Sequence, residues 1–303
     1  MGMIMRKWLL VLLAGLVATM AWVSPANAAD GAPVVDVHGI VGQGAGCTAV
    51  DSAKQAAPLQ QVLSANGYIG QVVPIDYYCG DSKGVSIRGA GGPSTAEYPQ
   101  NGYTLNTPIE RLGLDLASFV YDTYTVKGQP VNLACYSMGG LICTYALTHL
   151  GTPGFPPSLL VQNVVTFSTP FGGVDKSNFG TPEQYKLIWC GNYTQCDQLM
   201  PGSPFLTDLA QQSLPAGVDL TTLGGGPNDI MTYAASTTAL AQHAVNFYGS
   251  LPVKYNHNNM ITDTSLAFNM PARVTQRGGG TSQIYNGAHS LNWAAHAFVS
   301  SAW

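Results

Sequence analysis

Charged side chains are scarce in this chain of 303 residues, and basic side chains are the scarcest. Only 9% of the residues are charged, with 12 Lys and Arg against 16 Asp and Glu. A protein that binds nucleic acid through phosphate contacts needs a basic face, which this composition does not supply. The hydrophobic content of 46% also excludes a disordered chain. We therefore expect a folded protein with no nucleic-acid partner.

Long apolar runs are also lacking, apart from one at the N-terminus. Arg6 and Lys7 precede an apolar segment that runs to about residue 23, and Ala26 and Ala28 follow with the spacing of a small-residue cleavage site. This order predicts a signal peptide over residues 1–28 and hence a secreted or periplasmic protein. A retained anchor is the alternative, but the run is shorter than the roughly 20 residues of a spanning helix. We expect no membrane span.

Sequence patterns for metals and cofactors are absent as well. No cluster has zinc-ligand spacing, and no calcium loop occurs. The glycine triplets at 224–226 and 278–280 lack the Lys-Ser/Thr that completes a phosphate loop. We therefore expect no cofactor and no metal ion. Residues 29–303 hold 10 basic against 16 acidic side chains and are long enough for one domain with a substantial core, expected to be a monomer.

Apolar runs that suit strands alternate with segments of helical spacing. Strands are predicted at 34–38, 69–77, 131–136, 159–167, 230–235 and 283–285, and helices at 53–65, 107–124, 138–150 and 291–300. Two irregular insertions, about 170–228 and 237–258, interrupt the pattern. Strands that alternate with helices pair in parallel through right-handed crossovers. The sequence therefore predicts an α/β architecture with a mostly parallel sheet and helices on both faces.

Six cysteines remain in a chain that we expect to be exported, where disulfides are permitted. Cys190 and Cys196 are close in sequence and predict a small closed loop. Cys47 and Cys79 each follow a predicted strand and are candidates for a bridge between neighbouring loops. The remaining two cysteines flank a serine, and the sequence leaves open whether they are buried thiols or a bridge.

That serine, Ser137, lies in "LACYSMGGLICTYAL" (133–147), between a predicted strand and a predicted helix. The pattern is a G-x-S-x-G nucleophile elbow in which Cys135 replaces the first glycine, with Cys143 further along the helix. Gly139 and Gly140 supply the small residues that such a tight turn needs. An elbow exposes the hydroxyl at the carboxyl edge of the sheet, and the helix amides behind it favour negative charge. Ser137 is the candidate nucleophile, against the alternative of a serine that merely separates two elements.

Three further segments accompany this one: "VVDVHGIVGQG" (34–44), "VVTFSTPFGG" (164–173) and "YNGAHSLNW" (285–293). With these four segments in this order, the chain resembles the secreted bacterial lipases and esterases of the α/β-hydrolase superfamily, triacylglycerol lipases among them. The resemblance implies an α/β-hydrolase fold and a carboxylic ester hydrolase. Its mechanism would be a Ser-His-Asp triad and an acyl-enzyme.

The resemblance also implies where an oxyanion would be bound. One amide comes from the loop after the His-Gly pair and the other from the residue after the nucleophile, which are Ile40 and Met138 in this chain. His38 would then be structural and orient the loop.

The general base is implied to be His289, in a loop just before the last predicted helix. His296 lies inside that helix, and His257 lies in a polar loop without the family's sequence context.

The acid is expected after a late strand and before the histidine. Asp263 is the only carboxylate between residues 230 and 303, which makes it the predicted third member of the triad; its alternative role is a turn or helix N-cap. The family's usual acid position falls on Asn259, and Asp175 is a further alternative. Asp229 sits at the wrong end of its predicted strand.

The sequence leaves the substrate open between lipid or other acyl esters and an insoluble polyester. Aromatic residues of the insertions, such as Phe171, Tyr193 and Phe205, either line a site for such a substrate or belong to the core. Two alternatives to hydrolysis remain: an exported acyltransferase that uses the same residues, and a non-catalytic binding protein on a hydrolase scaffold.

Overall fold

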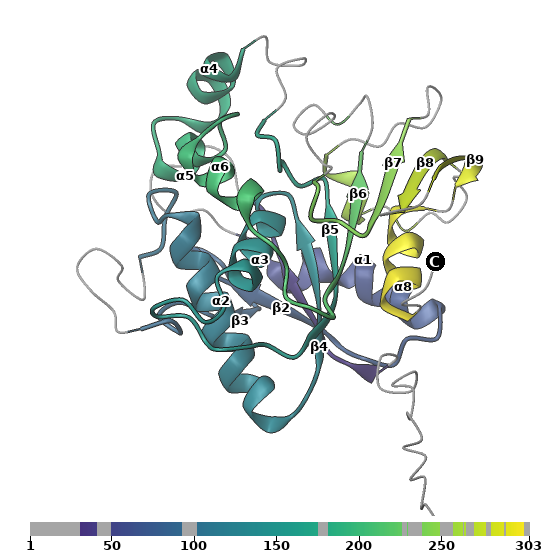
Figure 1. The fold of residues 1–303 in the computed structure, drawn as a ribbon, viewed down its shortest axis with the longest axis horizontal. Coiled ribbons are helices and arrows are strands. Elements are labelled where there is room, and N and C mark those ends of the chain that lie inside the picture. Colours follow the sequence, from purple (N-terminus) through teal and green to yellow (C-terminus); the bar gives the residue numbers. More distant parts are fainter. Residues whose placement is uncertain are drawn as a thin grey trace, which may run out of the picture.

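Figure 1 shows the chain as a computed structural model, in which a central sheet is flanked by helices. The structure describes residues 31–40, 50–92, 102–174, 181–225, 229, 238–248, 257–262, 264, 270–276, 280–287 and 289–299. The predicted signal peptide and the predicted strand at 230–235 lie outside these residues. Among the described helices, none is both long and apolar enough to cross a membrane.

Nine described strands form one sheet in the order β3-β2-β1-β4-β5-β6-β7-β8-β9. Neighbouring strands from β3 to β7 are parallel, and β8 and β9 add an antiparallel edge. Their bounds are β1 Val34–Val37, β2 Val72–Asp76, β3 Val85–Ser86, β4 Val131–Tyr136, β5 Val161–Phe167, β6 Asp219–Gly224, β7 His243–Phe247, β8 Met270–Gln276 and β9 Thr281–Gly287.

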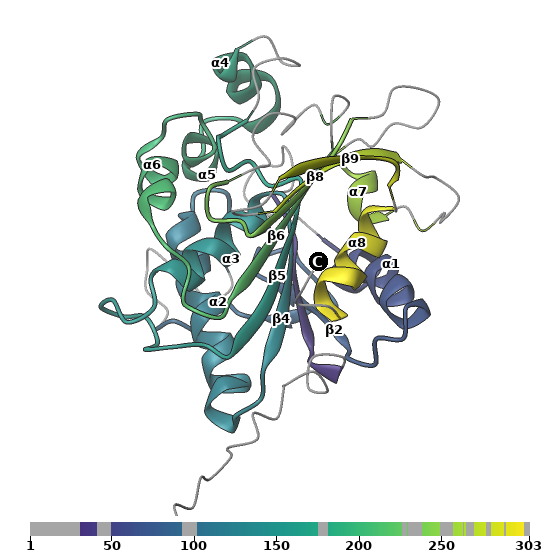
Figure 2. The same ribbon diagram turned by 45° about the vertical axis from the view of Figure 1, so that its right-hand side comes forward.

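Helices cover both faces of this sheet (Figure 2). The helices are α1 Ser52–Ala65, α2 Ile109–Thr123, α3 Met138–Thr148, α4 Pro182–Tyr185, α5 Thr194–Gln198, α6 Pro204–Gln211, α7 Asn259–Thr262 and α8 Ser290–Val299, with short turns η3 Thr125–Lys127 and η4 Lys186–Cys190. One core cluster lies under α2 and α3 and another under α1 and α8, because strand residues alternate between the faces: Val35 and Val37 join the first cluster and Val34 the second. The predicted α/β-hydrolase fold is confirmed.

The strand order brings three loops to one edge of the sheet. In parallel strands the carboxyl ends lie together, so the loops after β1, β4 and β6 open on the same side. The predicted strand at 131–136 is confirmed residue for residue, and the predicted helix that begins at Met138 ends at Thr148.

The two predicted insertions need correction, because each contains a strand of the central sheet. β6 lies within 170–228 and β7 within 237–258. β6 reads DLTTLG, in which Asp and two Thr interrupt the apolar run, yet all its residues after Asp219 are buried, and the strand pairs with β5 and β7. A central strand can therefore contain polar residues and still be covered on both faces, because its backbone hydrogen bonds are made with the strands on either side.

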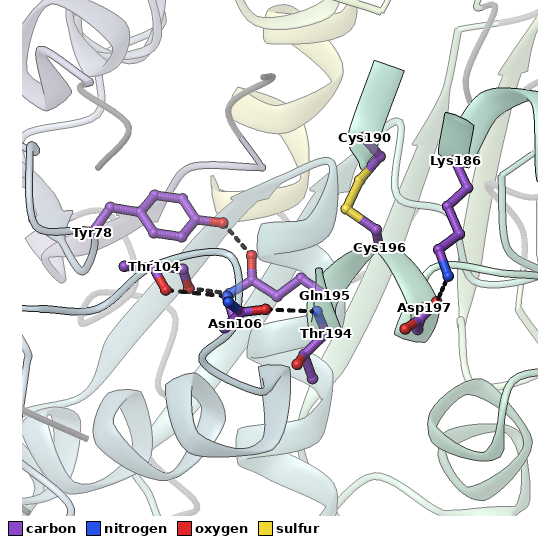
Figure 3. The surroundings of a disulfide bond; sticks show 9 residues. All are labelled: Tyr78, Thr104, Asn106, Lys186, Cys190, Thr194, Gln195, Cys196 and Asp197. Carbon is purple, nitrogen blue, oxygen red and sulfur yellow. Dashed lines mark hydrogen bonds and ion pairs between the residues drawn. A yellow bond between two sulfur atoms is a disulfide. The ribbon is translucent and has the colours of Figure 1, made fainter. Parts of the chain in front are cut away.

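The rest of the first segment is an excursion that carries α4, α5 and α6. The predicted Cys190–Cys196 bridge is formed there and joins η4 to α5 (Figure 3). Gln195, next to the bridge, accepts a 2.5 Å hydrogen bond from the Tyr78 hydroxyl and donates to the carbonyl of Thr107. These contacts attach the excursion to the body of the molecule. Three of its described aromatic residues belong to the core: Phe205 is buried, and Phe171 and Tyr193 pack against the cluster under α2 and α3.

Candidate active site

Ser137 occupies the turn between β4 and α3 and has the backbone geometry of a nucleophile elbow. Its φ is 54° and its ψ is −126°, a conformation that is strained for a residue with a side chain. Its amide donates to the Phe167 carbonyl at 2.8 Å, and its carbonyl accepts from the Gly140 amide at 3.0 Å. The turn is therefore fixed on both sides, with Ser137 at its apex.

The two glycines after Ser137 have the steric role predicted for them. A Cβ at Gly139 would lie 2.2 Å from the Val37 carbonyl oxygen, and one at Gly140 would lie 1.9 Å from Thr169 Oγ1. These distances leave no space for a side chain, so α3 approaches the strand ends as closely as its backbone allows. The Cys135 side chain is bonded to Cys143 in α3, which resolves the choice between buried thiols and a bridge.

The histidine bonded to Ser137 is His257, which corrects the predicted pairing with His289. His257 Nε2 lies 2.8 Å from Ser137 Oγ, and His257 Nδ1 lies 3.0 Å from Asp229 Oδ1. A carboxylate only accepts hydrogen bonds, so Nδ1 carries the proton and Nε2 is free to accept from the serine hydroxyl. Asp229 is fully buried, while about 13% of the His257 side chain is exposed.

His289 has a different environment. It immediately precedes α8, and its Nδ1 accepts a 3.2 Å hydrogen bond from the Leu291 amide, as a helix N-cap does. Gly287, the glycine that favoured His289 in the sequence, is the last residue of β9, and His289 caps the helix that follows. His296 lies within α8.

The acid bonded to the histidine is Asp229, which corrects the choice of Asp263. β6 ends at Gly224, so Asp229 comes five residues after the end of a strand of the central sheet. Asp263 and Asp175 lie outside the described residues, and Asn259 is the first residue of α7. The order nucleophile, acid, base along the chain agrees with the predicted one. Recognition of β6 in the sequence would have pointed to Asp229, which follows that strand in the chain, whereas His257 has no such local signal.

The loop after β1 lies directly against the serine. A Cβ at Gly39 would lie 2.6 Å from Ser137 Cβ and 3.2 Å from Ser137 Oγ. The next residue, Ile40, and the first residue of α3, Met138, are the two predicted oxyanion donors. The structure thus brings the peptide segments that carry both amides close to Ser137.

His38 fastens this loop, as its predicted structural role requires. Its Nε2 lies 2.9 Å from Asp81 Oδ2, and its ring stacks on Tyr77 with centroids 4.0 Å apart. The same carboxylate oxygen accepts the amides of Tyr77 and Tyr78, and the Tyr77 hydroxyl donates to the His38 carbonyl. Asp81 therefore connects the loop after β1 to the segment after β2.

Tyr136, the residue before the nucleophile, packs beside the histidine. The two ring centroids are 5.1 Å apart, and the Tyr136 hydroxyl donates to Asn258 Oδ1 at 3.0 Å. Burial, with a smaller contribution from the Asp229 carboxylate, raises the pKa of Tyr136 well above its ordinary value. The hydroxyl therefore stays protonated and holds Asn258, the neighbour of His257.

A cavity of about 580 Å³ opens beside these residues. The loop after β1, the end of β4, the start of α1 and the segment around α7 line it, through Gly39, Ile40, Val50, Asp51, Lys54, Gln55, Pro58, Tyr136, Asn258, Ile261 and Thr262. Its volume lies in the range of small-molecule sites. Within the described part of the chain, no group of three or more His, Cys, Asp or Glu side chains is placed to hold a metal ion.

No family model and no curated protein matches the chain. Solved structures do match, with low identity. The mature form of the Bacillus licheniformis lipase BlEst2 is 18% identical over 66% of this chain and 67% of its own, with a TM-score of 0.39. Its propeptide form is 17% identical over 79% of this chain and 49% of its own, with a TM-score of 0.47.

A lipase-esterase related protein of Clostridium acetobutylicum is 14% identical over 79% of this chain and 91% of its own, with a TM-score of 0.41. Lipases and esterases are thus among the matches, as the resemblance in the sequence led us to expect. The likenesses are distant, and no residue of the site takes its role from them.

Proposed function

We propose that this protein is a serine carboxylic ester hydrolase with Ser137 as nucleophile, His257 as general base and Asp229 as the acid that orients it. The observation that carries the proposal is the continuous hydrogen-bonded chain from Ser137 Oγ through both His257 nitrogens to Asp229, with links of 2.8 and 3.0 Å. A serine hydroxyl becomes an effective nucleophile when a base of this kind is in contact with it.

The reaction follows from the positions of these groups. Ser137 Oγ attacks the ester carbonyl carbon while His257 Nε2 takes the hydroxyl proton. The C–O bond to the alcohol then breaks, and His257 returns the proton to the departing alcohol. Water attacks the resulting acyl-serine, His257 takes its proton, and the carboxylic acid leaves as Ser137 regains a proton. Asp229 keeps the proton on Nδ1 and stabilises the imidazolium.

The carbonyl oxygen becomes negative in both steps and needs donors in place beforehand. We assign this role to the backbone amides of Ile40 and Met138. Gly39, in contact with Ser137, supports the first assignment, and the position of Met138 at the start of α3 supports the second.

The cavity beside the site favours an ester with one uncharged, apolar arm. Ile40, Val50, Pro58 and Ile261 give the cavity apolar lining. Of its polar lining groups, the Tyr136 hydroxyl donates to Asn258, and Asp51 accepts the Lys54 amide and pairs with Lys83. An apolar arm would pack on the apolar side chains and leave these polar contacts intact.

The primary test is active-site labelling. A fluorophosphonate should modify the protein stoichiometrically at Ser137, and Ser137→Ala should abolish both labelling and hydrolysis of p-nitrophenyl esters. Hydrolysis that survives in purified Ser137→Ala would contradict the mechanism. Adding alcohol or sugar acceptors and analysing products separates hydrolysis from acyl transfer, and clearing of emulsified triglyceride or polyester distinguishes a lipase from a depolymerase.

The substrate arm is tested by filling the cavity. Ile261→Trp should reduce kcat/KM for long arms while acetate esters react as before, and Val126→Trp, at an exposed position on η3, is the control. One substrate series varies the acyl chain and another varies the alcohol, which shows which arm the cavity receives. Equal effects of Ile261→Trp on short and long esters would exclude the cavity as the binding site.

We propose further that residues 1–28 direct export, and that residues 29–303 act as one monomeric domain outside the cytoplasm. Two buried disulfides support an oxidising compartment, because such bonds are rare where thiols are kept reduced.

A further inference from the structure

The bridge between Cys135 and Cys143 is the part of the elbow that the proposed chemistry does not explain. Cys135 stands two residues before Ser137, where the elbow pattern has glycine, and Cys143 lies in the second turn of α3. Their Cα atoms are 6.6 Å apart, and both residues are completely buried. The bond therefore joins the two arms of the turn that has Ser137 at its apex.

Ser137 needs support from its surroundings, because its positive φ is unfavourable for a residue with a Cβ. Such a conformation persists only where neighbouring structure fixes it. After Ser137, close contacts at Gly139 and Gly140 supply that support. Before Ser137 the glycine is missing, and the covalent bond of Cys135 to the helix stands in its place.

The strand end of the bridge is rigid. Cys135 pairs with Val37 of β1 on one side and with Thr166 of β5 on the other, in the middle of the sheet. The helix end carries Met138, a proposed oxyanion donor. A tilt of α3 would move the Met138 amide and the Ser137 hydroxyl relative to His257, which comes from a separate segment after β7.

We propose that the Cys135–Cys143 bridge is a positioning element for the nucleophile. It sets the angle between β4 and α3, and it acts through Ser137 and Met138 without touching substrate. The inference rests on the proposed function of Ser137.

The experiment compares two pairs of substitutions. Cys135→Ala/Cys143→Ala removes this bridge, and Cys190→Ala/Cys196→Ala removes the other, which closes a loop of similar size: the cysteines are 6 residues apart instead of 8. The fluorophosphonate labelling rate, kcat and KM are measured on protein that melts cooperatively. We expect the first pair to lower kcat and the labelling rate about tenfold or more with little change in KM, since small displacements of reacting groups are costly. The control pair should keep both rates.

A bridge-free protein with the labelling rate and kcat of the wild type would overturn the inference, and so would an equal loss of rate in the control pair. Cys135→Val/Cys143→Ala refills the volume without a bond; it should regain melting temperature but not kcat, and recovered kcat would also overturn the inference. It serves in place of the alanine pair if that pair does not fold. If the wild type is not labelled at Ser137, the proposed function fails instead.

Discussion

At the scale of single residues, the site depends on which histidine reaches the serine. His257→Ala should lower kcat by about 10⁴-fold or more, because Ser137 loses its base, and Asp229→Asn should have a loss of similar order through the wrong tautomer. His289→Gln should keep kcat and lower the melting temperature, because His289 Nδ1 accepts from the Leu291 amide at the start of α8, whereas the histidine bonded to Ser137 is His257. Kinetics with p-nitrophenyl butyrate and thermal melts check these values. A large loss of kcat in His289→Gln would instead support His289 as the base that acts on Ser137.

Asp36 is a second residue with a measurable consequence. Burial raises its pKa to about 7, and the nearby charge of His38 opposes that rise. The folded chain therefore holds this proton more tightly than the unfolded chain, whose aspartate has an ordinary pKa of 3.8, so its contribution to stability falls as pH rises from about 4 to 7.

Replacement of Asp36 by the neutral isostere should remove this dependence. The unfolding free energy of Asp36→Asn minus that of the wild type should be on the order of 2 kcal/mol larger at pH 8 than at pH 5. Urea unfolding at the two pH values measures the difference. Parallel pH curves for both proteins would show that Asp36 ionises normally.

At the scale of elements, α3 packs closely against the loop after β5 because Gly140 has no side chain. Gly140→Ala places a Cβ 1.9 Å from Thr169 Oγ1, so α3 or the loop must shift, at a cost of about 1–3 kcal/mol. The labelling rate of Ser137 should fall with it. Gly280→Ala is the matched control, because a Cβ there meets no atom within 4 Å. Unchanged stability in Gly140→Ala, measured by urea unfolding, would show that the loop yields freely.

The elements also explain what could be predicted from the sequence. β4, Ser137 and α3 were predictable because an apolar run, a small-residue turn and a helical pattern follow one another locally. β6 was not, because Asp219 and two threonines interrupt its apolar run, although Thr221 and Thr222 are buried in the fold. Without β6, Asp229 could not be placed after a strand. His257 has no local pattern at all, since its position is set by the order of strands in the sheet.

At the scale of the whole molecule, the predicted export of the protein can be tested through cleavage of the predicted signal peptide. Expression in a bacterial host with its own leader should give a product that begins at Ala29, and mass spectrometry of the exported protein detects this. Retention of residues 1–28 in the released protein would contradict the predicted cleavage site.

The two described disulfides also bear on how the molecule is assembled. Each joins cysteines separated by only eight or six residues, so the two thiols of each pair meet often in the unfolded chain, without contact between strands distant in sequence. Oxidation of the reduced chain in urea should therefore form these two bonds in preference to pairings between distant cysteines, which peptide mapping detects. A majority of long-range pairings would show that the fold brings these thiols together.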